Sequence, residues 1–184
     1  MESNSNQLAI NNGLFIGGIS IILGILVYYV SPDLMGATSF GIIMMLLSLA
    51  LYIFFTIDLR KKVGGFWSFR EALKGIFLMS FIAGLVSIVV NFVFYKFIEP
   101  GAYEKISEIV TQNLSTTYEK LGMDQATIDK TIPEVLEKMK AQFDPSFTDV
   151  LKNLGIAVLI QFVMSLIFAA IFKKEQPIFT STEE

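Results

Sequence analysis

The sequence predicts an all-α integral membrane protein with four transmembrane helices and a small helical extracytoplasmic cap between the third and fourth helices. Three observations lead to this fold class. The 184 residues are 53% hydrophobic and 17% charged, whereas a soluble domain is about 45–50% apolar and about 25% charged. Four apolar stretches are long enough to cross a bilayer, and a polar segment with amphipathic helical patterns separates the last two.

The four apolar stretches cover residues 13–30, 40–57, 75–97 and 154–172. A bilayer core needs about 20 helical residues, and the third stretch alone contains a charge, Lys96 near its end. Backbone groups in lipid must bond internally, so each stretch is expected to be a helix. The predicted bundle comprises residues 1–97 and 154–184. No Lys or Arg precedes the first span, unlike in a signal peptide, so that span is expected to be retained.

Basic residues beside the spans predict the orientation. Residues 58–74 carry five Lys or Arg and two more Lys open the C-terminal tail, whereas residues 31–39 carry none. Cytoplasmic loops are enriched in Lys and Arg, so both termini are expected in the cytoplasm and residues 98–153 outside it. The residues expected at the membrane interface are Arg60, Lys61, Lys62, Trp67, Arg70, Lys74, Lys173 and Lys174.

Small residues recur at spacings of three and four along three of the spans, which places them on one face of each helix. Lipid is as apolar as Leu, so helices in a bilayer associate through such closely packing faces. We interpret these stripes as seams of a four-helix bundle, with a homodimer face as the alternative for a subset. The predicted packing residues are Gly13, Gly17, Ser20, Gly24, Ser80, Gly84, Ser87, Ser165 and Ala169.

Two amide side chains lie inside the spans, Asn91 in the third and Gln161 in the fourth. Their distances from the predicted outer span ends correspond to about 9–11 Å of helix in both cases. This equal depth predicts that the third and fourth spans are adjacent and that the two amides share a hydrogen bond or a water. The alternative is that they face an aqueous pocket. The span cores carry no Asp, Glu, Lys or Arg, which argues against an ion-coupled transporter.

Local patterns predict where three helices begin. A capping box, Ser or Thr followed three residues later by Glu, occurs before the third span and again within residues 98–153. A short helix ending at about residue 130 is expected before the second box. An Asp-Pro pair then predicts the cap of a helix that leads into the fourth span. The predicted capping residues are Ser68, Glu71, Thr131, Glu134 and Asp144.

Residues 98–153 therefore form a small helical cap in this interpretation. A segment of this size cannot bury a large core of its own. We expect it to pack on itself, on the extended ends of the third and fourth spans, or on a partner.

Composition excludes several classes of function. The chain has no Cys and no His, which removes thiol nucleophiles, zinc-thiolate and iron–sulfur sites, and the commonest general base and metal ligand. The net charge of −3 offers no attraction to nucleic acid. We therefore expect no catalytic residue, no cofactor, no metal and no nucleic-acid partner.

Three segments of the chain resemble a bacterial family. Residues 64–72 read Gly-Gly-aromatic-x-Ser-Phe-x-Glu-Ala, residues 91–100 form an aromatic-rich run that ends in Ile-Glu-Pro, and residues 169–174 read Ala-Ala-Ile-Phe-Lys-Lys. These motifs are similar to those of domain of unknown function 4199, found mainly in Bacteroidetes. The resemblance implies a four-span protein of the bacterial inner membrane, and it implies no activity, substrate or catalytic residue.

The sequence favours a non-enzymatic scaffold or accessory subunit of a membrane complex. Residue types that commonly act in catalysis are scarce, whereas the stripes of small residues and the amphipathic cap are suited to binding a partner protein. The expected partners are membrane lipids and either another membrane or periplasmic protein or a second copy of the chain. The alternative is a small transporter, channel or lipid-handling protein, which requires a cavity that water or lipid reaches near the midplane.

Overall fold

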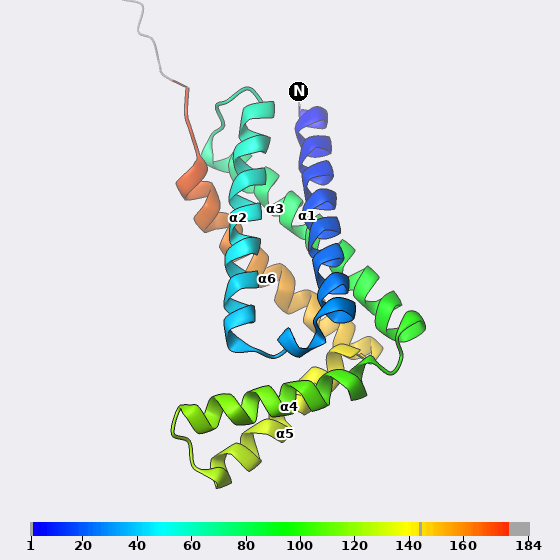
Figure 1. The fold of residues 1–184 in the computed structure, drawn as a ribbon. Coiled ribbons are helices and arrows are strands. Elements are labelled where there is room, and N and C mark those ends of the chain that lie inside the picture. Colours follow the sequence, from blue (N-terminus) through cyan, green and yellow to red (C-terminus); the bar gives the residue numbers. More distant parts are fainter. Residues whose placement is uncertain (1, 144, 177–184) are drawn as a thin grey trace, which may run out of the picture.

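The computed structural model describes residues 2–143 and 145–176, and these residues form helices with no β-strand among them. Four long helices form a bundle, and two shorter helices form a hairpin across one end (Figure 1). The predicted all-α fold class is confirmed. In chain order the elements are α1 (Glu2–Val30), the 3-10 turn η1 (Pro32–Leu34), α2 (Thr38–Lys62), α3 (Phe69–Val93), the π-helical turn η2 (Phe94–Ile98), α4 (Ala102–Lys120), α5 (Gln125–Phe143) and α6 (Phe147–Phe172).

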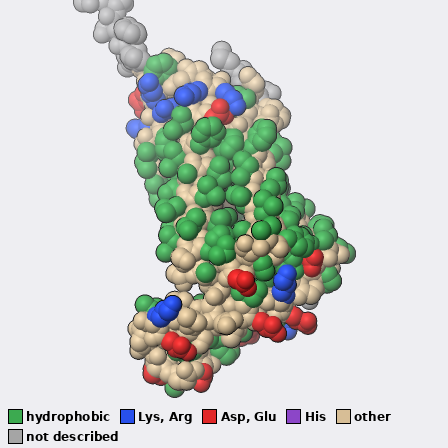
Figure 2. Space-filling view, viewed as in Figure 1, with side chains coloured by type: hydrophobic (Ala, Val, Ile, Leu, Met, Phe, Trp, Pro, Cys, Tyr) green, Lys and Arg blue, Asp and Glu red, His purple; other side chains and the backbone are tan. Residues whose placement is uncertain are grey.

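All four predicted spans are present as helices long and apolar enough to cross a membrane, over Asn4–Val30, Thr38–Lys62, Phe69–Ile98 and Thr148–Phe172. The start of α1, the α2–α3 loop and the end of α6 lie at the same end of the bundle (Figure 1). Figure 2 shows a broad hydrophobic belt, with Lys and Arg gathered at this end and acidic side chains concentrated around the α4–α5 hairpin. We call the two ends the basic end and the hairpin end. This distribution is that of a membrane protein.

Helix α3 is the centre of the bundle because it packs against α1 on one side and α6 on the other. Two predicted glycines allow the close approach of α1. A Cβ added at Gly13 would lie 2.5 Å from the backbone oxygen of Met79, and one added at Gly17 would lie 3.2 Å from that of Ala83. The seam with α6 contains Ser80, Ser165 and Ala169, all of them buried. The packing prediction is thus confirmed for these five small residues.

Gly84 also belongs to the seam with α6, because an added Cβ there would collide with the side-chain amide of Gln161, whereas Gly24, Ser20 and Ser87 show no comparable contact. Gly24 is exposed and has no atom within 4 Å of an added Cβ. Near this position the ring of Tyr28 packs edge-on against Phe94, with centroids 5.4 Å apart, and side chains of this size hold the two backbones apart. Ser20 is half-buried, and the hydroxyl of Ser87 donates to the carbonyl of Ala83 in its own helix.

The α4–α5 hairpin builds its apolar core together with the ends of the bundle helices. Buried side chains of α4, such as Ile106 and Val110, cluster with Tyr28 and Phe94 of the bundle, and Phe143 of α5 packs against them. Because much of the apolar face of α4 is covered in this way, the hairpin is attached to the bundle. This agrees with the expectation that a cap of this size packs on the ends of the spans.

Polar contacts also attach the hairpin. Glu99, just after η2, accepts hydrogen bonds from the hydroxyls of Tyr28 at 3.1 Å and Tyr29 at 2.6 Å. These bonds, first that of Tyr29, hold the pKa of Glu99 below its ordinary value, with a smaller contribution from the charge of Lys105. The ammonium of Lys105 on α4 lies 4.7 Å from the centre of the Tyr28 ring. The carboxylate therefore stays ionised and joins α1 to the segment between α3 and α4.

The second predicted capping box, Thr131 with Glu134, is wrong because α5 is one continuous helix over these residues. The helix begins after Asp124, whose carboxylate accepts the backbone N–H of Thr127 at 3.0 Å. Thr131 lies inside the helix, where its hydroxyl donates to the carbonyl of Thr127. Pro133 leaves the backbone carbonyl of Asp129 without its helical donor, and Asp129 is an exposed residue.

The start of α6 is capped by Ser146. Its hydroxyl accepts the backbone N–H of Asp149 at 3.1 Å, and the Asp149 carboxylate accepts the N–H of Ser146 in return. Asp144, the predicted cap, lies outside the described residues. The helix begins seven residues before the predicted span start at 154, which changes the depth of every residue on it.

The first prediction concerns the α1–α3 seam. In Gly13→Ala the new methyl group meets the Met79 carbonyl, so a helix must move, and we expect a loss of about 1–3 kcal/mol in the free energy of unfolding. The measurement is the thermal unfolding midpoint in detergent. Gly24→Ala is the matched control, because its methyl group meets nothing and Ala is a better helix former than Gly by about 1 kcal/mol. Equal losses in the two variants would contradict this seam.

Candidate functional site

The candidate site is a groove of about 280 Å³ between α2 and α6. Helix α2 packs mainly along α1 rather than on α6, so the facing sides of α2 and α6 are left apart. The groove has apolar walls and a polar floor. Its walls include Met45 and Leu49 of α2 and Met164 of α6, and its floor includes Ser80, Gln161 and Ser165.

Two serines form part of the floor where α3 meets α6. The hydroxyl oxygens of Ser80 and Ser165 lie 3.4 Å apart, and both residues are buried. Ser80 donates to the carbonyl of Phe77, and Ser165 donates to the carbonyl of Gln161. Each hydroxyl proton thus has an acceptor in its own helix, and the small side chains allow the two backbones to approach.

Gln161 is the unusual residue of the groove. It lies near the middle of the span Thr148–Phe172, and its side-chain amide packs against Gly84, where an added Cβ would collide with it. Among the described residues, nothing forms a hydrogen bond with this amide. An amide at this depth has no water to bond, so it carries hydrogen-bonding capacity that a molecule in the groove can use.

The predicted pair of Asn91 and Gln161 is wrong, although the predicted adjacency of the third and fourth spans is confirmed. The contact of Gln161 with Gly84 sets the register of the two helices. Asn91 lies seven residues beyond Gly84, or about 10 Å along α3. It lines a different cavity, of about 570 Å³, together with Asn153 and Gln142 near the hairpin end. The depth estimate failed because α6 begins earlier than the apolar stretch does.

Sequence reasoning missed a polar contact between α1 and α2. The amide of Asn12, 1% exposed, donates to the carboxylate of Asp58 at 2.9 Å and to the carbonyl of Phe55 at 3.2 Å. Lys62 forms an ion pair with the same carboxylate at 2.7 Å. The available signal was that Asn12 shares a helical face with the apolar residues Ala9 and Ile16, both of which are buried.

The predicted capping box at the start of α3 is confirmed. The carboxylate of Glu71 accepts the backbone N–H of Ser68 at 2.8 Å, and the hydroxyl of Ser68 accepts the N–H of Glu71 at 3.4 Å. This fixes the point at which the α2–α3 loop turns into α3.

Trp67 in this loop differs from the predicted lipid-facing anchor. Its ring is buried. Its indole N–H donates a hydrogen bond of 2.8 Å to the carbonyl of Phe172, at the end of α6. Its backbone pairs with that of Lys174, and Arg60 donates to the same Phe172 carbonyl. The loop is therefore fastened to the end of α6. The remaining predicted interface residues are exposed at this basic end: Lys61, Lys62, Arg70, Lys74, Lys173 and Lys174.

These features define the class of the molecule, a helical membrane protein with four apolar helices and a helical hairpin at one end. The chain belongs to the family described as "Protein of unknown function (DUF4199)", whose model matches residues 11–174. The matched range includes α2 to α6 and most of α1, and it confirms the family predicted from the motifs. Neither the curated proteins nor the solved structures give a match to the chain.

The second prediction concerns the unpartnered amide. In Gln161→Leu the groove keeps a side chain of similar size and loses a half-buried amide, whose missing hydrogen bonds inside a membrane cost about 1–3 kcal/mol. We expect the isolated protein in detergent to keep or raise its thermal unfolding midpoint. Ser165→Ala, which removes a hydroxyl that has an acceptor, is the comparison and should lower the midpoint slightly. A clear loss in Gln161→Leu would show that the amide is satisfied within the chain.

Proposed function

We propose that this protein is a non-enzymatic accessory subunit of a membrane complex and that a transmembrane helix of another protein docks in the α2–α6 groove. The observation that carries the proposal is the unpartnered amide of Gln161 near mid-span, facing an apolar groove. Acyl chains offer no hydrogen-bonding group at this depth, whereas a polar side chain on a helix does. The occupant is therefore expected to be a helix that carries Asn, Gln, Ser or Thr at its middle.

The walls of the groove suit such a helix. Met45 and Met164 are flexible side chains that adjust to an irregular surface. Ser80 and Ser165 are small, so the side chains of a docked helix can reach the floor. Interhelical bonds to a polar side chain contribute about 0.6 kcal/mol on average, and up to about 1.7. The amide thus selects and orients the partner helix, and packing provides most of the affinity.

The proposal places the protein in the inner membrane of a bacterium, with the basic end and both termini in the cytoplasm. Support comes from the enrichment of Lys and Arg at the end that holds the α2–α3 loop. The α4–α5 hairpin is then on the outer side, next to the partner.

The second cavity favours one alternative, a lipid-handling protein. Its lining combines the apolar Ile88 and Phe92 with the amides of Asn91 and Asn153, and those four residues belong to α3 and α6 near the hairpin end. An amphipathic molecule such as a lipid fits this combination. The experiment on the groove separates the two functions.

The third prediction tests the docked helix. A photo-crosslinking amino acid at Met164, in native membranes, should give one discrete adduct, whose cross-linked peptide is an apolar helix with a polar residue at its middle. Adding Gln161→Leu should abolish the adduct, because the partner loses its hydrogen bond, while Gln161→Asn should retain part of it. The same amino acid at Ile22, which is 60% exposed on α1 and outside the groove, is the matched control and should give no such adduct.

Three outcomes would overturn this proposal. An adduct with the mass of a lipid that is indifferent to Gln161→Leu favours the lipid-handling function. An adduct with twice the mass of this chain favours a homodimer. The same adduct from Met164 and Ile22 means that the groove has no special partner.

The fourth prediction tests the orientation. The chain contains no Cys, so a single introduced Cys reports its own side of the membrane. In intact cells, an impermeant maleimide should label Lys120→Cys at the end of α4 and leave Lys61→Cys in the α2–α3 region unlabelled until the membrane is opened. The reverse pattern would contradict the orientation.

A further inference from the structure

The cavity of about 570 Å³ at the hairpin end lies where α3, the end of α5 and the first turns of α6 meet. Three carboxamide side chains from three helices line it: Asn91 of α3, Gln142 of α5 and Asn153 of α6. The rest of the lining is mostly apolar and includes Ile88 and Phe92. The cavity thus combines polar groups of one chemical kind with apolar walls.

The two asparagines lie at about the same level of the bundle. Helices α3 and α6 run in opposite directions (Figure 1), and the contact of Gln161 with Gly84 sets their register. Asn91 comes seven residues after Gly84, and Asn153 comes eight residues before Gln161. Each asparagine is therefore about 10–12 Å of helix from this contact, toward the hairpin end.

That level is close to the edge of the hydrocarbon core. The spans Phe69–Ile98 and Thr148–Phe172 have 30 and 25 residues, so they measure about 45 and about 38 Å. The core is about 30 Å thick, so both spans, if centred, extend a few ångströms beyond it at each end. Asn91 lies seven residues from the end of its span, and Asn153 lies five residues from the start of its own. Both amides are thus about 3–5 Å inside the core.

These amides are available to a ligand. In the part of the chain that the structure describes, none of the three forms a hydrogen bond, and all three residues are exposed. Just inside the hydrocarbon, where water is scarce, an unbonded amide is costly. The acceptors that a membrane lipid offers at this level are the ester carbonyls that join its acyl chains to glycerol. A carboxamide N–H donates to such a carbonyl.

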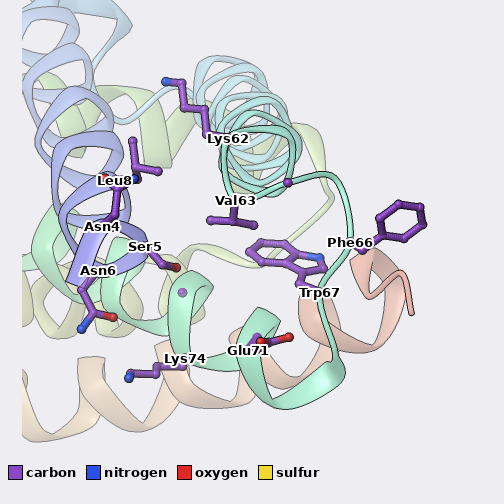
Figure 3. Close-up of a pocket in the computed structure, with 12 residues that line it drawn as sticks. Asn4, Ser5, Asn6, Leu8, Lys62, Val63, Phe66, Trp67, Glu71 and Lys74 are labelled. Carbon is purple, nitrogen blue, oxygen red and sulfur yellow. The ribbon is translucent and has the colours of Figure 1, made fainter. Parts of the chain in front are cut away.

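The cavity at the basic end differs from this one. It has about 430 Å³, and Figure 3 shows Trp67 across it from the first turns of α1. Its lining includes charged groups of both signs, and two of them are engaged within the chain. Lys62 pairs with Asp58 at 2.7 Å, and the carboxylate of Glu71 accepts the N–H of Ser68 at 2.8 Å. Its charges therefore do not define a ligand, in contrast to three unbonded amides around one apolar space.

We propose that the hairpin-end cavity holds a diacyl glycerolipid of the adjoining leaflet by its ester groups. Asn91 and Asn153 donate to the two ester carbonyls, and Gln142, on the hairpin outside the core, bonds the headgroup. The acyl chains lie along the apolar walls. Lys96 also lines the cavity, but the proposal assigns no role to its charge, so the ester region is what the protein recognises.

This inference goes beyond the proposed function and does not rest on it. The hairpin-end cavity and the α2–α6 groove share no lining residue. A lipid held in one place is a fixed ligand of the protein, so its presence is compatible with a helix docked in the groove.

The ester groups can be removed without changing the rest of the lipid. The full-length protein, in a maltoside detergent that contains no ester, is titrated with phosphatidylethanolamine, which has no net charge, and with its dialkyl ether analogue. Native mass spectrometry counts the bound lipid. A hydrogen bond inside a membrane changes affinity about threefold on average, so losing two carbonyl acceptors should weaken binding about tenfold. Equal affinities for the two lipids would overturn the proposal.

Matched variants locate the site. Asn91→Leu and Asn153→Leu should each weaken binding of the ester lipid about threefold and leave that of the ether analogue nearly unchanged, because each variant removes one donor. The unfolding midpoint of each variant without lipid checks that it is folded. If the double variant keeps the full preference for the ester lipid, the esters bind elsewhere and the proposal is wrong.

Gln161→Leu separates this inference from the docked helix. It removes an unpartnered amide that lines the α2–α6 groove and not this cavity, so binding of both lipids should stay unchanged. Ester preference lost in Gln161→Leu and kept in the asparagine variants would place the lipid in the groove and overturn this inference. Preference lost in the asparagine variants alone supports it, whatever the photo-crosslinking at Met164 shows.

Discussion

The structure depends on the close approach of α1 to α3 through Gly13 and Gly17. Inside a bilayer, apolar surface gains nothing by leaving lipid, so helices must be held by packing contacts. The two glycines bring the backbone of α1 against the carbonyls of Met79 and Ala83. On its opposite side α3 repeats the device with the small residue Ser80 against α6. Helix α2 meets α3 closely near the basic end, where Leu59 lies beside Gly75, but it packs mainly along α1, which leaves the groove toward α6 open.

Hydrogen bonding is distributed unevenly with depth. At the basic end the amide of Asn12 and the carboxylate of Asp58 satisfy each other, and at the hairpin end Glu99 accepts from two tyrosines. Near the middle, by contrast, Gln161 has an amide without a described partner. The buried hydroxyl of Thr56 is also unsatisfied, but it lies outside the groove lining. These polar groups at the two ends of the bundle thus have hydrogen-bond partners within the chain. A molecule bound in the α2–α6 groove, in contrast, would add a hydrogen bond that the chain itself does not make.

The positions of the spans and of a helix cap could be predicted from the sequence, whereas the contacts between helices were predicted with less success. The four spans and the Ser68 cap depend on residues close in sequence, and these are present. The pairing of Asn91 with Gln161 depended on where α6 begins, and a polar first turn capped by Ser146 moved that start by seven residues. The predicted packing role of Gly24 was wrong for a similar reason. The rings that separate α1 from α3 near it, Tyr28 and Phe94, come from two segments distant in sequence.

Trp67 shows that one hydrogen bond decides whether an aromatic ring faces the lipid headgroups or packs inside the protein. An aromatic residue beside basic ones predicts a ring that lies in the headgroups. Here the indole instead bonds the last turn of α6, which joins the loop to that helix and turns the ring into a cavity wall. The basic residues nearby then surround an enclosed volume rather than a flat surface. The same carbonyl of Phe172 also accepts from Arg60 at the end of α2, so the ends of three helices are joined through this one turn.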